Sequence, residues 1–335
     1  MRAKSTSLTI VADTLAVPRD FGSRRGEGTR RAISFGGGGL YFVAWQLAYL
    51  RGLGEAGVIL DGADQLIGTS AGALVATAFA AGRAKAMHDQ MVLLSRFPAV
   101  LAALAPSGQL APSQTRALDL FGNAVTADPA TVQRIGHAAL GAATPSTAAM
   151  RRNVALTVRV RRWPSASLSI TCVDAYTGER CVITSDARVS PAAAMAASSA
   201  IPGIFPPQPI LDRFCMDGGV SGSGLHLDLV AGAERVLVFS LNQVPENEKD
   251  GMTKHAGDTS SEIAALRATG TEVIVRSPAP VPLEDLMSPG AVTDAVAKGQ
   301  ASGIADADEI REFWGTAERV ESPRSGRIRS GRGTR

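Results

Sequence analysis

The N-terminal part of the chain alternates between short apolar runs and longer segments with helical apolar spacing. Arg31–Phe35 forms a short apolar run, and from Leu40 to Leu53 apolar side chains recur every three or four residues. The same pattern then repeats, with a strand predicted at Gln65–Thr69 and a helix at Ala71–Ala81. Strand, helix, strand and helix at this spacing predict a βαβ unit with parallel strands.

The later part of the chain predicts further strands and helices. Alternating positions predict strands at Val154–Val160 and Leu168–Asp174, and a turn at Thr177–Glu179 predicts a hairpin with Arg180–Thr184. Phe97–Pro106 is apolar and bounded by proline. We interpret this segment as part of the core; the alternative is a cap that gives an apolar substrate a way in. The other predicted elements are helices at Ala84–Leu94, Pro191–Ser199 and Ala291–Trp314, and strands at Val236–Leu241 and Glu272–Arg276.

Composition indicates a folded α/β protein without a disulfide framework. The 335 residues are 45% hydrophobic and 19% charged, which supports a sizeable core and argues against disorder. Three cysteines are too few for a disulfide scaffold, so a reducing compartment is the simpler interpretation. Cys172 and Cys181 flank the predicted hairpin and can approach each other, but a role as small buried apolar residues is favoured over pairing.

Charge divides the chain into three regions. Residues 1–31 carry a net charge of +4, residues 316–335 also carry +4, and residues 32–315 carry −5. We therefore expect a basic, flexible N-terminal arm, one domain over 32–315 and a disordered arginine-rich tail. The basic ends can contact an anionic membrane surface, and a solvated tail without a partner is as good an interpretation. No nucleic acid partner is expected.

Neither a secretory signal nor a transmembrane helix is expected from the sequence. The apolar stretch Leu8–Val17 is short and is interrupted by Asp13, and the longest uncharged run contains several prolines. The expected location is therefore the cytoplasm, with peripheral contact at the membrane. No cluster of histidines and cysteines has metal-ligand spacing, so no metal or cofactor is expected.

Ser70 lies between Gly68 and Gly72 at the predicted turn from strand to helix. This Gly-x-Ser-x-Gly arrangement is typical of a nucleophile held at a sharp turn beneath a helix N-terminus. The glycine run Gly36–Gly39 ends the preceding strand and offers backbone N–H groups for an anion. It lacks the lysine of a phosphate-binding P-loop, so we interpret Gly37, Gly38 and Gly39, with the N–H of Ala71, as an oxyanion hole.

A serine nucleophile also needs a base, and an aspartate is a better candidate than any histidine. Asp217 leaves a short apolar strand directly into Gly218 and Gly219, so it can sit in a tight turn and face Ser70. His226 is the alternative base for a Ser-His-Asp esterase. The remaining histidines, His88, His137 and His255, lie in less suitable positions.

Five ordered segments resemble the patatin-like phospholipases. The glycine run, the Gly-Thr-Ser-Ala-Gly turn and the Asp-Gly-Gly segment resemble the three signatures of that family, and residues 174–179 and 196–206 are also similar. The resemblance covers roughly residues 32–315. It implies a three-layer α/β/α fold with a central, mainly parallel sheet, and lipid degradation by a Ser-Asp catalytic dyad with Ser70 as nucleophile and Asp217 as base.

The sequence departs from the family pattern at two points. No cation follows the glycine run before Arg51, although the family usually has one there, and this leaves the head-group preference open. The Asp-Gly-Gly segment also lacks the proline that often follows it. We therefore expect an acyl hydrolase for lipid or lysophospholipid esters that acts in lipid metabolism. The alternatives are a weakly active lipid-binding or regulatory protein of the same fold and a general carboxylesterase that uses His226.

Overall fold

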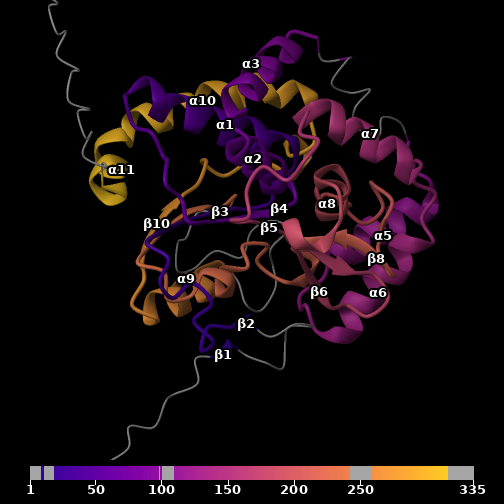
Figure 1. Cartoon of the computed structure of the whole chain (residues 1–335). Coiled ribbons are helices and arrows are strands. Elements are labelled where there is room, and N and C mark those ends of the chain that lie inside the picture. The colour runs from indigo at the N-terminus through magenta and orange to yellow at the C-terminus, as the bar shows by residue number, and fades with distance from the viewer. Residues whose placement is uncertain (1–8, 11–18, 98, 100–108, 242–258, 316–335) are drawn as a thin grey trace, which may run out of the picture.

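The computed structural model describes residues 9–10, 19–97, 99, 109–241 and 259–315. A central sheet separates two layers of helices, which confirms the expected three-layer α/β/α fold (Figure 1). The strands are β1 (Thr9–Ile10), β2 (Arg19–Asp20), β3 (Arg31–Phe35), β4 (Gln65–Thr69), β5 (Leu168–Asp174), β6 (Arg180–Ile183), β7 (Gln208–Ile210), β8 (Arg213–Asp217), β9 (Arg235–Phe239) and β10 (Glu272–Arg276).

The α-helices cover both faces of this sheet. In Figure 1, α1, α2, α3 and α10 lie on one side of the sheet and α9 lies on the other. The helices are α1 (Gly39–Glu55), α2 (Ala71–Ala80), α3 (Ala84–Ser95), α5 (Pro112–Gly122), α6 (Pro129–Leu140), α7 (Thr147–Val158), α8 (Pro191–Ser198), α9 (Thr259–Ala268), α10 (Val292–Ala305) and α11 (Ala307–Trp314).

The sheet is parallel in one half and antiparallel in the other. Its strand order is β10-β9-β3-β4-β5-β8-β7, with β6 also paired to β5. The first five strands are mutually parallel, which confirms the predicted βαβ unit of β3, α1 and β4. The strands β6, β8 and β7 add antiparallel pairs beyond β5.

One edge of β5 receives two strands end to end. The strand β4 pairs with β5 as far as Thr69 opposite Thr171, and β8 pairs with the same strand from Cys215 opposite Asp174 to Asp217 opposite Cys172. The strand β6 overlaps both of these pairings, so it lies on the other edge of β5. The carboxyl ends of β4 and β8 therefore meet head to head, at neighbouring residues of β5.

Alternating side chains of the parallel strands fill two separate cores. Ile33, Leu66 and Leu237 point to the core under α1 and α2, whereas Ala32 and Val236 point to the core under α9. Both faces of the sheet are thus buried, which explains why the strands read as continuous apolar runs instead of alternating apolar and polar positions.

The strand predicted at Val154–Val160 is wrong, because these residues belong to α7 and the turn that follows it. The side chain of Ser146 accepts a hydrogen bond from the N–H of Ala149 and so caps the helix N-terminus. The buried residues Met150, Val154 and Val158 are four apart, so a helical face explains the burial.

The predicted single helix Ala291–Trp314 is also corrected, because two helices meet there at Asp306. The carboxylate of Asp306 accepts a hydrogen bond from the hydroxyl of Tyr49 at 2.8 Å and pairs with Arg276 at 2.8 Å. These contacts fix the corner between α10 and α11.

Residues 19–31 form part of the packed domain and are not a flexible arm. Arg19 and Phe21 are fully buried, and Arg19 Nε pairs with Glu262 Oε1 at 2.9 Å. The other described part of the expected arm is β1. Residues 1–8, 11–18 and 316–335, most of Phe97–Pro106 and His255 lie outside the described residues. Within the described ranges, no helix is both long enough and apolar enough to cross a bilayer.

Glycines allow α1 and α10 to pack with their backbones almost in contact. A Cβ atom placed on Gly52 of α1 would lie 2.3 Å from the carbonyl oxygen of Gln300 in α10. In the same way, Cβ atoms on Gly299 and Gly303 would lie 2.4 Å and 2.2 Å from carbonyl oxygens of α1. Larger side chains at these positions would force the helices apart.

We predict opposite effects for two alanine substitutions in α1. Gly52→Ala would place a methyl group against backbone and lower the free energy of unfolding by about 1–3 kcal/mol. Gly54→Ala is the matched control because no atom lies within 4 Å of the added Cβ, and it should raise stability by about 0.5–1 kcal/mol through helix propensity. Urea denaturation measures both; equal effects would contradict the close packing.

Candidate active site

Ser70 sits at the turn between β4 and α2 in a strained backbone conformation. Its φ of 54° and ψ of −122° are unusual for a residue other than glycine. A Cβ atom on Gly72 would lie 1.9 Å from the carbonyl oxygen of Phe35, and one on Gly68 would lie 2.8 Å from Ala73 Cα. The two flanking glycines are therefore required by close backbone approach, as expected for this kind of turn.

Two serines from the end of α8 hold the Ser70 backbone in place. The hydroxyl of Ser198 accepts a hydrogen bond from the N–H of Ser70 at 2.8 Å and donates to the carbonyl of Thr171 at 2.7 Å. The hydroxyl of Ser199 donates to the carbonyl of Ser70 at 3.1 Å. Sequence reasoning gave these serines no role, although they lie in the segment 196–206 that carried the family resemblance.

Asp217 ends β8 and is buried, with 3% of its surface exposed. Its Oδ1 accepts a hydrogen bond from the N–H of Gly219 at 2.8 Å, whereas its Oδ2 has no partner among the described residues. Burial raises the pKa of Asp217 to about 7, and the nearby Ser70 hydroxyl and the Gly219 N–H oppose that rise. The carboxyl group is thus poised to gain or lose a proton near neutral pH.

The structure brings the two predicted catalytic residues together through the edge of β5. Ser70 follows Thr69, which pairs with Thr171, while Asp217 pairs with the next residue of β5. The Ser70 hydroxyl lies close enough to influence the Asp217 carboxyl, although no hydrogen bond joins them in this state.

The glycine run lies against Ser70 and leaves several backbone donors free. A Cβ atom on Gly37 would lie 3.1 Å from the Cβ of Ser70, so this loop borders the serine directly. The N–H of Gly36 donates to the carbonyl of Phe239 at 2.9 Å. Within the described chain, the N–H groups of Gly37, Gly38, Gly39 and Ala71 donate to no protein acceptor.

A segment far along the sequence holds the end of this loop. Gly39 has a φ of 67°, and a Cβ there would lie 2.5 Å from the carbonyl oxygen of Leu286. The same carbonyl accepts a hydrogen bond from the N–H of Tyr41 at 3.0 Å. The loop thus keeps its shape through a contact that only glycine permits.

Two buried ion pairs support the loop that follows Asp217. Arg19 donates to the carbonyl of Ser221 at 3.0 Å and pairs with Glu262, which in turn accepts from the N–H of Leu227 at 3.1 Å. Arg180 donates to both carboxylate oxygens of Asp228, at 2.7 Å and 2.8 Å. These charges are paired and hydrogen-bonded, so they fix the loop behind the carboxyl group.

His226 is not placed to act as the base for Ser70. It is fully buried, and its two ring nitrogens face the carbonyl of Gly218 at 3.2 Å and the guanidinium of Arg180 at 3.3 Å. Burial and the nearby charges of Arg19 and Arg180 hold the pKa of His226 well below its usual value. His88 contacts Asp89, and His137 lies beside Tyr176, so neither joins the site.

An apolar cavity of about 150 Å³ opens beside Ser70. The residues after the glycine run line it, which is where a cation was expected from the family pattern. Methionines from three different segments contribute much of the remaining wall. The side chains that line it include Leu40, Val43, Leu74, Met91, Met150, Phe205 and Met287.

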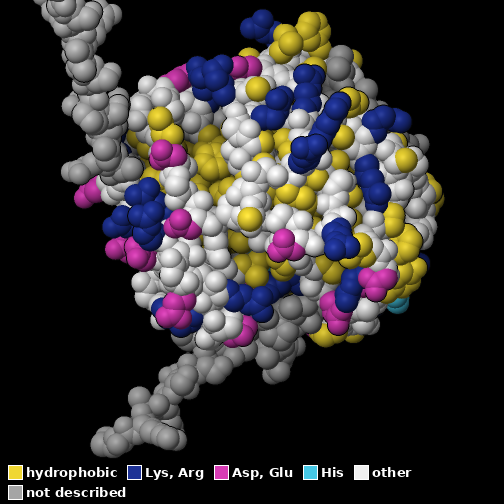
Figure 2. Space-filling view, in the orientation of Figure 1, with side chains coloured by type: hydrophobic (Ala, Val, Ile, Leu, Met, Phe, Trp, Pro, Cys, Tyr) yellow, Lys and Arg dark blue, Asp and Glu magenta, His cyan; other side chains and the backbone are white. Residues whose placement is uncertain are grey.

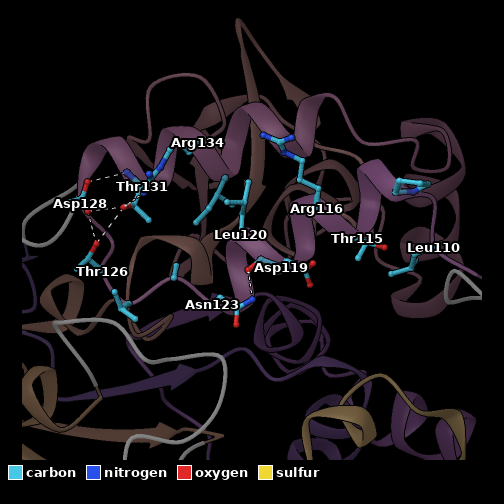
Figure 3. A pocket seen from close by; sticks show the side chains of 14 residues that line it. Leu110, Thr115, Arg116, Asp119, Leu120, Asn123, Thr126, Asp128, Thr131 and Arg134 are labelled. Carbon is cyan, nitrogen blue, oxygen red and sulfur yellow. Dashed lines mark hydrogen bonds between the residues drawn. The ribbon is translucent and has the colours of Figure 1, made fainter.

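A second, larger cavity of about 990 Å³ lies between α5 and α6 and does not include Ser70. Figure 3 shows charged side chains along it, among them Arg116, Asp119 and Arg134. Asp128 at its end is held by the hydroxyls of Thr126 and Thr131. We assign no catalytic role to this cavity.

Two solved structures match most of this chain at low sequence identity. The structure of VipD from Legionella pneumophila matches 92% of this chain and 72% of its own, at 12% identity and a TM-score of 0.40. The structure of the type III effector protein ExoU matches 91% of this chain and 59% of its own, at 16% identity and a TM-score of 0.35.

Comparison with curated proteins found no match. A family model, in contrast, matches residues 33–229, more than half of the chain, and this span holds the glycine run, Ser70 and Asp217. The chain belongs to the patatin-like phospholipase family.

Proposed function

We propose that this protein is a serine acyl hydrolase that cleaves lipid, phospholipid or lysophospholipid esters through a Ser70–Asp217 dyad. One observation carries the proposal: a serine with a strained backbone borders an apolar cavity and lies close to the buried carboxyl of Asp217, whose Oδ2 has no hydrogen-bond partner among the described residues. A carboxylate in that position can accept the serine proton directly, without a histidine between them.

The first chemical step transfers the acyl group to the enzyme. Ser70 Oγ attacks the ester carbonyl carbon while Asp217 Oδ2 takes the hydroxyl proton, and the C–O bond to the alcohol then breaks as that proton passes to the departing oxygen. The negative charge on the carbonyl oxygen is stabilised by the free N–H groups of the glycine run and of Ala71. The N-terminus of α2 adds a favourable dipole.

The second step returns the enzyme to its starting state. Asp217 takes a proton from a water molecule, the hydroxide attacks the acyl carbonyl carbon, and the bond from that carbon to Ser70 Oγ breaks as the serine recovers its proton. The products are a fatty acid and the free enzyme.

The surroundings of the site fit a substrate with an apolar chain and an anionic head group. The walls of the cavity are apolar and suit an acyl chain. The helix α7 lines the cavity, and residues 147–163 contain five arginines and no acidic residue. Figure 2 shows Lys and Arg side chains gathered over the part of the face where α7 lies in Figure 1. We propose that this surface supplies the positive charge that the glycine run lacks.

Substitution of either dyad residue should abolish most of the activity. Asp217→Asn removes the base and should lower kcat by about 10²–10⁴-fold. Ser70→Ala removes the nucleophile and should lower kcat by at least as much. Asp212→Asn is the matched control, since this exposed carboxylate on the same hairpin loses the same charge. Turnover of a chromogenic ester and of phospholipid vesicles measures the effect.

Labelling with a fluorophosphonate probe separates this proposal from a binding protein of the same fold. The intact protein and Asp212→Asn should label, and Ser70→Ala should not. An intact protein that neither labels nor turns over any ester would contradict the proposed activity and favour the lipid-binding alternative.

The pH dependence of activity should report the raised pKa of Asp217. The base must be ionised, so kcat/KM for an ester that does not titrate should fall about tenfold per pH unit below about pH 7 and level off above it. A profile measured from pH 5 to 9 checks this. A limb near pH 4 would show that the carboxyl has an ordinary pKa and would contradict its assigned environment.

Asp217→Asn should also change how stability depends on pH. Because folding raises the pKa of this carboxyl from 3.8 to about 7, the folded protein loses stability as pH rises through that window. Asparagine cannot ionise and avoids this loss. The free energy of unfolding of the variant, relative to that of the wild type, should therefore rise by up to about 4 kcal/mol between pH 4 and pH 8. Urea denaturation of both proteins at pH 5 and pH 8 measures this change. An equal stability difference between variant and wild type at the two pH values would show that burial does not penalise the charge.

A further inference from the structure

The fold brings all three cysteines of the chain into one cluster. Cys172, Cys181 and Cys215 come from β5, β6 and β8, and their sulfur atoms all lie within 4.8 Å of one another. Each is a free thiol. Cys172 and Cys215 are fully buried, whereas Cys181 is half-buried and gives access from solvent.

Strand register explains why the three sulfurs meet. Cys172 pairs with Cys181 across β5 and β6, so their side chains share a face of the sheet. On the other edge of β5, Cys172 pairs with Asp217, and Cys215 lies two residues before Asp217 on the same face. The cluster therefore spans three strands, and the candidate catalytic carboxyl belongs to the same row of side chains.

The spacing of the sulfurs fits a bound metal ion. For a metal–sulfur distance of about 2.3 Å, two thiolates are about 3.8 Å apart in a tetrahedral site and about 4.0 Å apart in a trigonal one. The sulfurs of Cys181 and Cys215 are 3.9 Å apart. The widest pair needs to close by less than about 1 Å, which side-chain rotation supplies without any change of the strands.

We propose that Cys172, Cys181 and Cys215 form a binding site for one thiophilic d¹⁰ cation, with Zn²⁺ as the reference ion. Thiolates are the ligands that such ions prefer. Binding replaces the three S–H bonds by three metal–sulfur bonds and releases three protons to solvent. The fourth position faces the half-buried side of Cys181, where water can complete the coordination.

A neighbouring arginine places a positive charge beside this site. Three thiolates and a divalent ion carry a net charge of −1. The guanidinium of Arg213 lies beside Cys181, and it also pairs with Glu179 at 2.7 Å. Arg213 also pairs with Asp174 at 3.4 Å, so its charge offsets only part of the negative charge around the cluster.

An ion at this cluster would link β5, β6 and β8 through coordination bonds. It would hold the strand that carries Asp217 against the two strands beside it, so binding should raise the thermal stability of the folded protein. This inference rests on the cysteine geometry and does not depend on the proposed hydrolase activity.

Titration of the reduced, desalted protein with Cd²⁺ under anaerobic conditions tests the site. We expect a thiolate-to-metal charge-transfer absorption that saturates at one ion per chain, with close to three protons released per ion. Zn²⁺ should displace Cd²⁺ and reverse the absorption, and Zn²⁺ alone should raise Tm.

Two variants give the test its controls. Cys181→Ala changes the most accessible ligand and should lose most of the absorption and the shift in Tm. His137→Ala removes an exposed histidine at which metals bind nonspecifically, and should leave both unchanged. Alkylation of the thiols in the folded protein, followed by mass spectrometry, should show protection by Zn²⁺ in the intact chain.

The proposal is overturned by any of three results. The first is the absence of charge-transfer absorption in protein whose three thiols are shown to be reduced. The second is absorption that Cys181→Ala leaves intact. The third is proton release close to one per ion, which would indicate a single surface thiol as the ligand.

Discussion

The arrangement of this protein depends on the shared edge of β5, where two strands that run in opposite directions end against each other. The parallel strand β4 delivers Ser70 to this point, and the antiparallel strand β8 delivers Asp217 to the neighbouring position. Strand pairing fixes the positions of both residues through backbone hydrogen bonds. Two side chains placed in this way need no long loop to bring them together. The rigid sheet positions them more accurately than loops would.

Burial around this edge has a cost that the structure meets in two ways. The charges of Arg19 and Arg180 are paired with carboxylates, and their hydrogen bonds fix the backbone behind Asp217. The carboxyl of Asp217 has a raised pKa, and one of its oxygens has no partner in the part of the chain that the structure describes. The difference between these groups is physical: a paired charge supports structure, whereas an unpaired one is available for chemistry.

The sequence predicts those parts that depend on local patterns. The helix α1, the strand β4 and the Ser70 turn follow from apolar spacing and flanking glycines, and Asp217 stood out because two glycines follow it. The region around Val154 was misread because its apolar residues fit both a strand and a helix, and only packing decides between them. The predicted hairpin allowed Cys172 and Cys181 to approach each other. Their meeting with Cys215 could not be predicted, since it depends on the pairing of β5 with β8, a strand farther along the chain.

The contact of Leu286 with the glycine run shows that the candidate site extends beyond the span that the family model matches. The family model ends at residue 229, yet the carbonyl of Leu286 fixes the end of the glycine run, and Met287 lines the cavity beside Ser70. A segment outside the matched span thus shapes both the loop and the wall of the cavity. The shape of the cavity beside Ser70 therefore depends on residues that none of the family signatures includes.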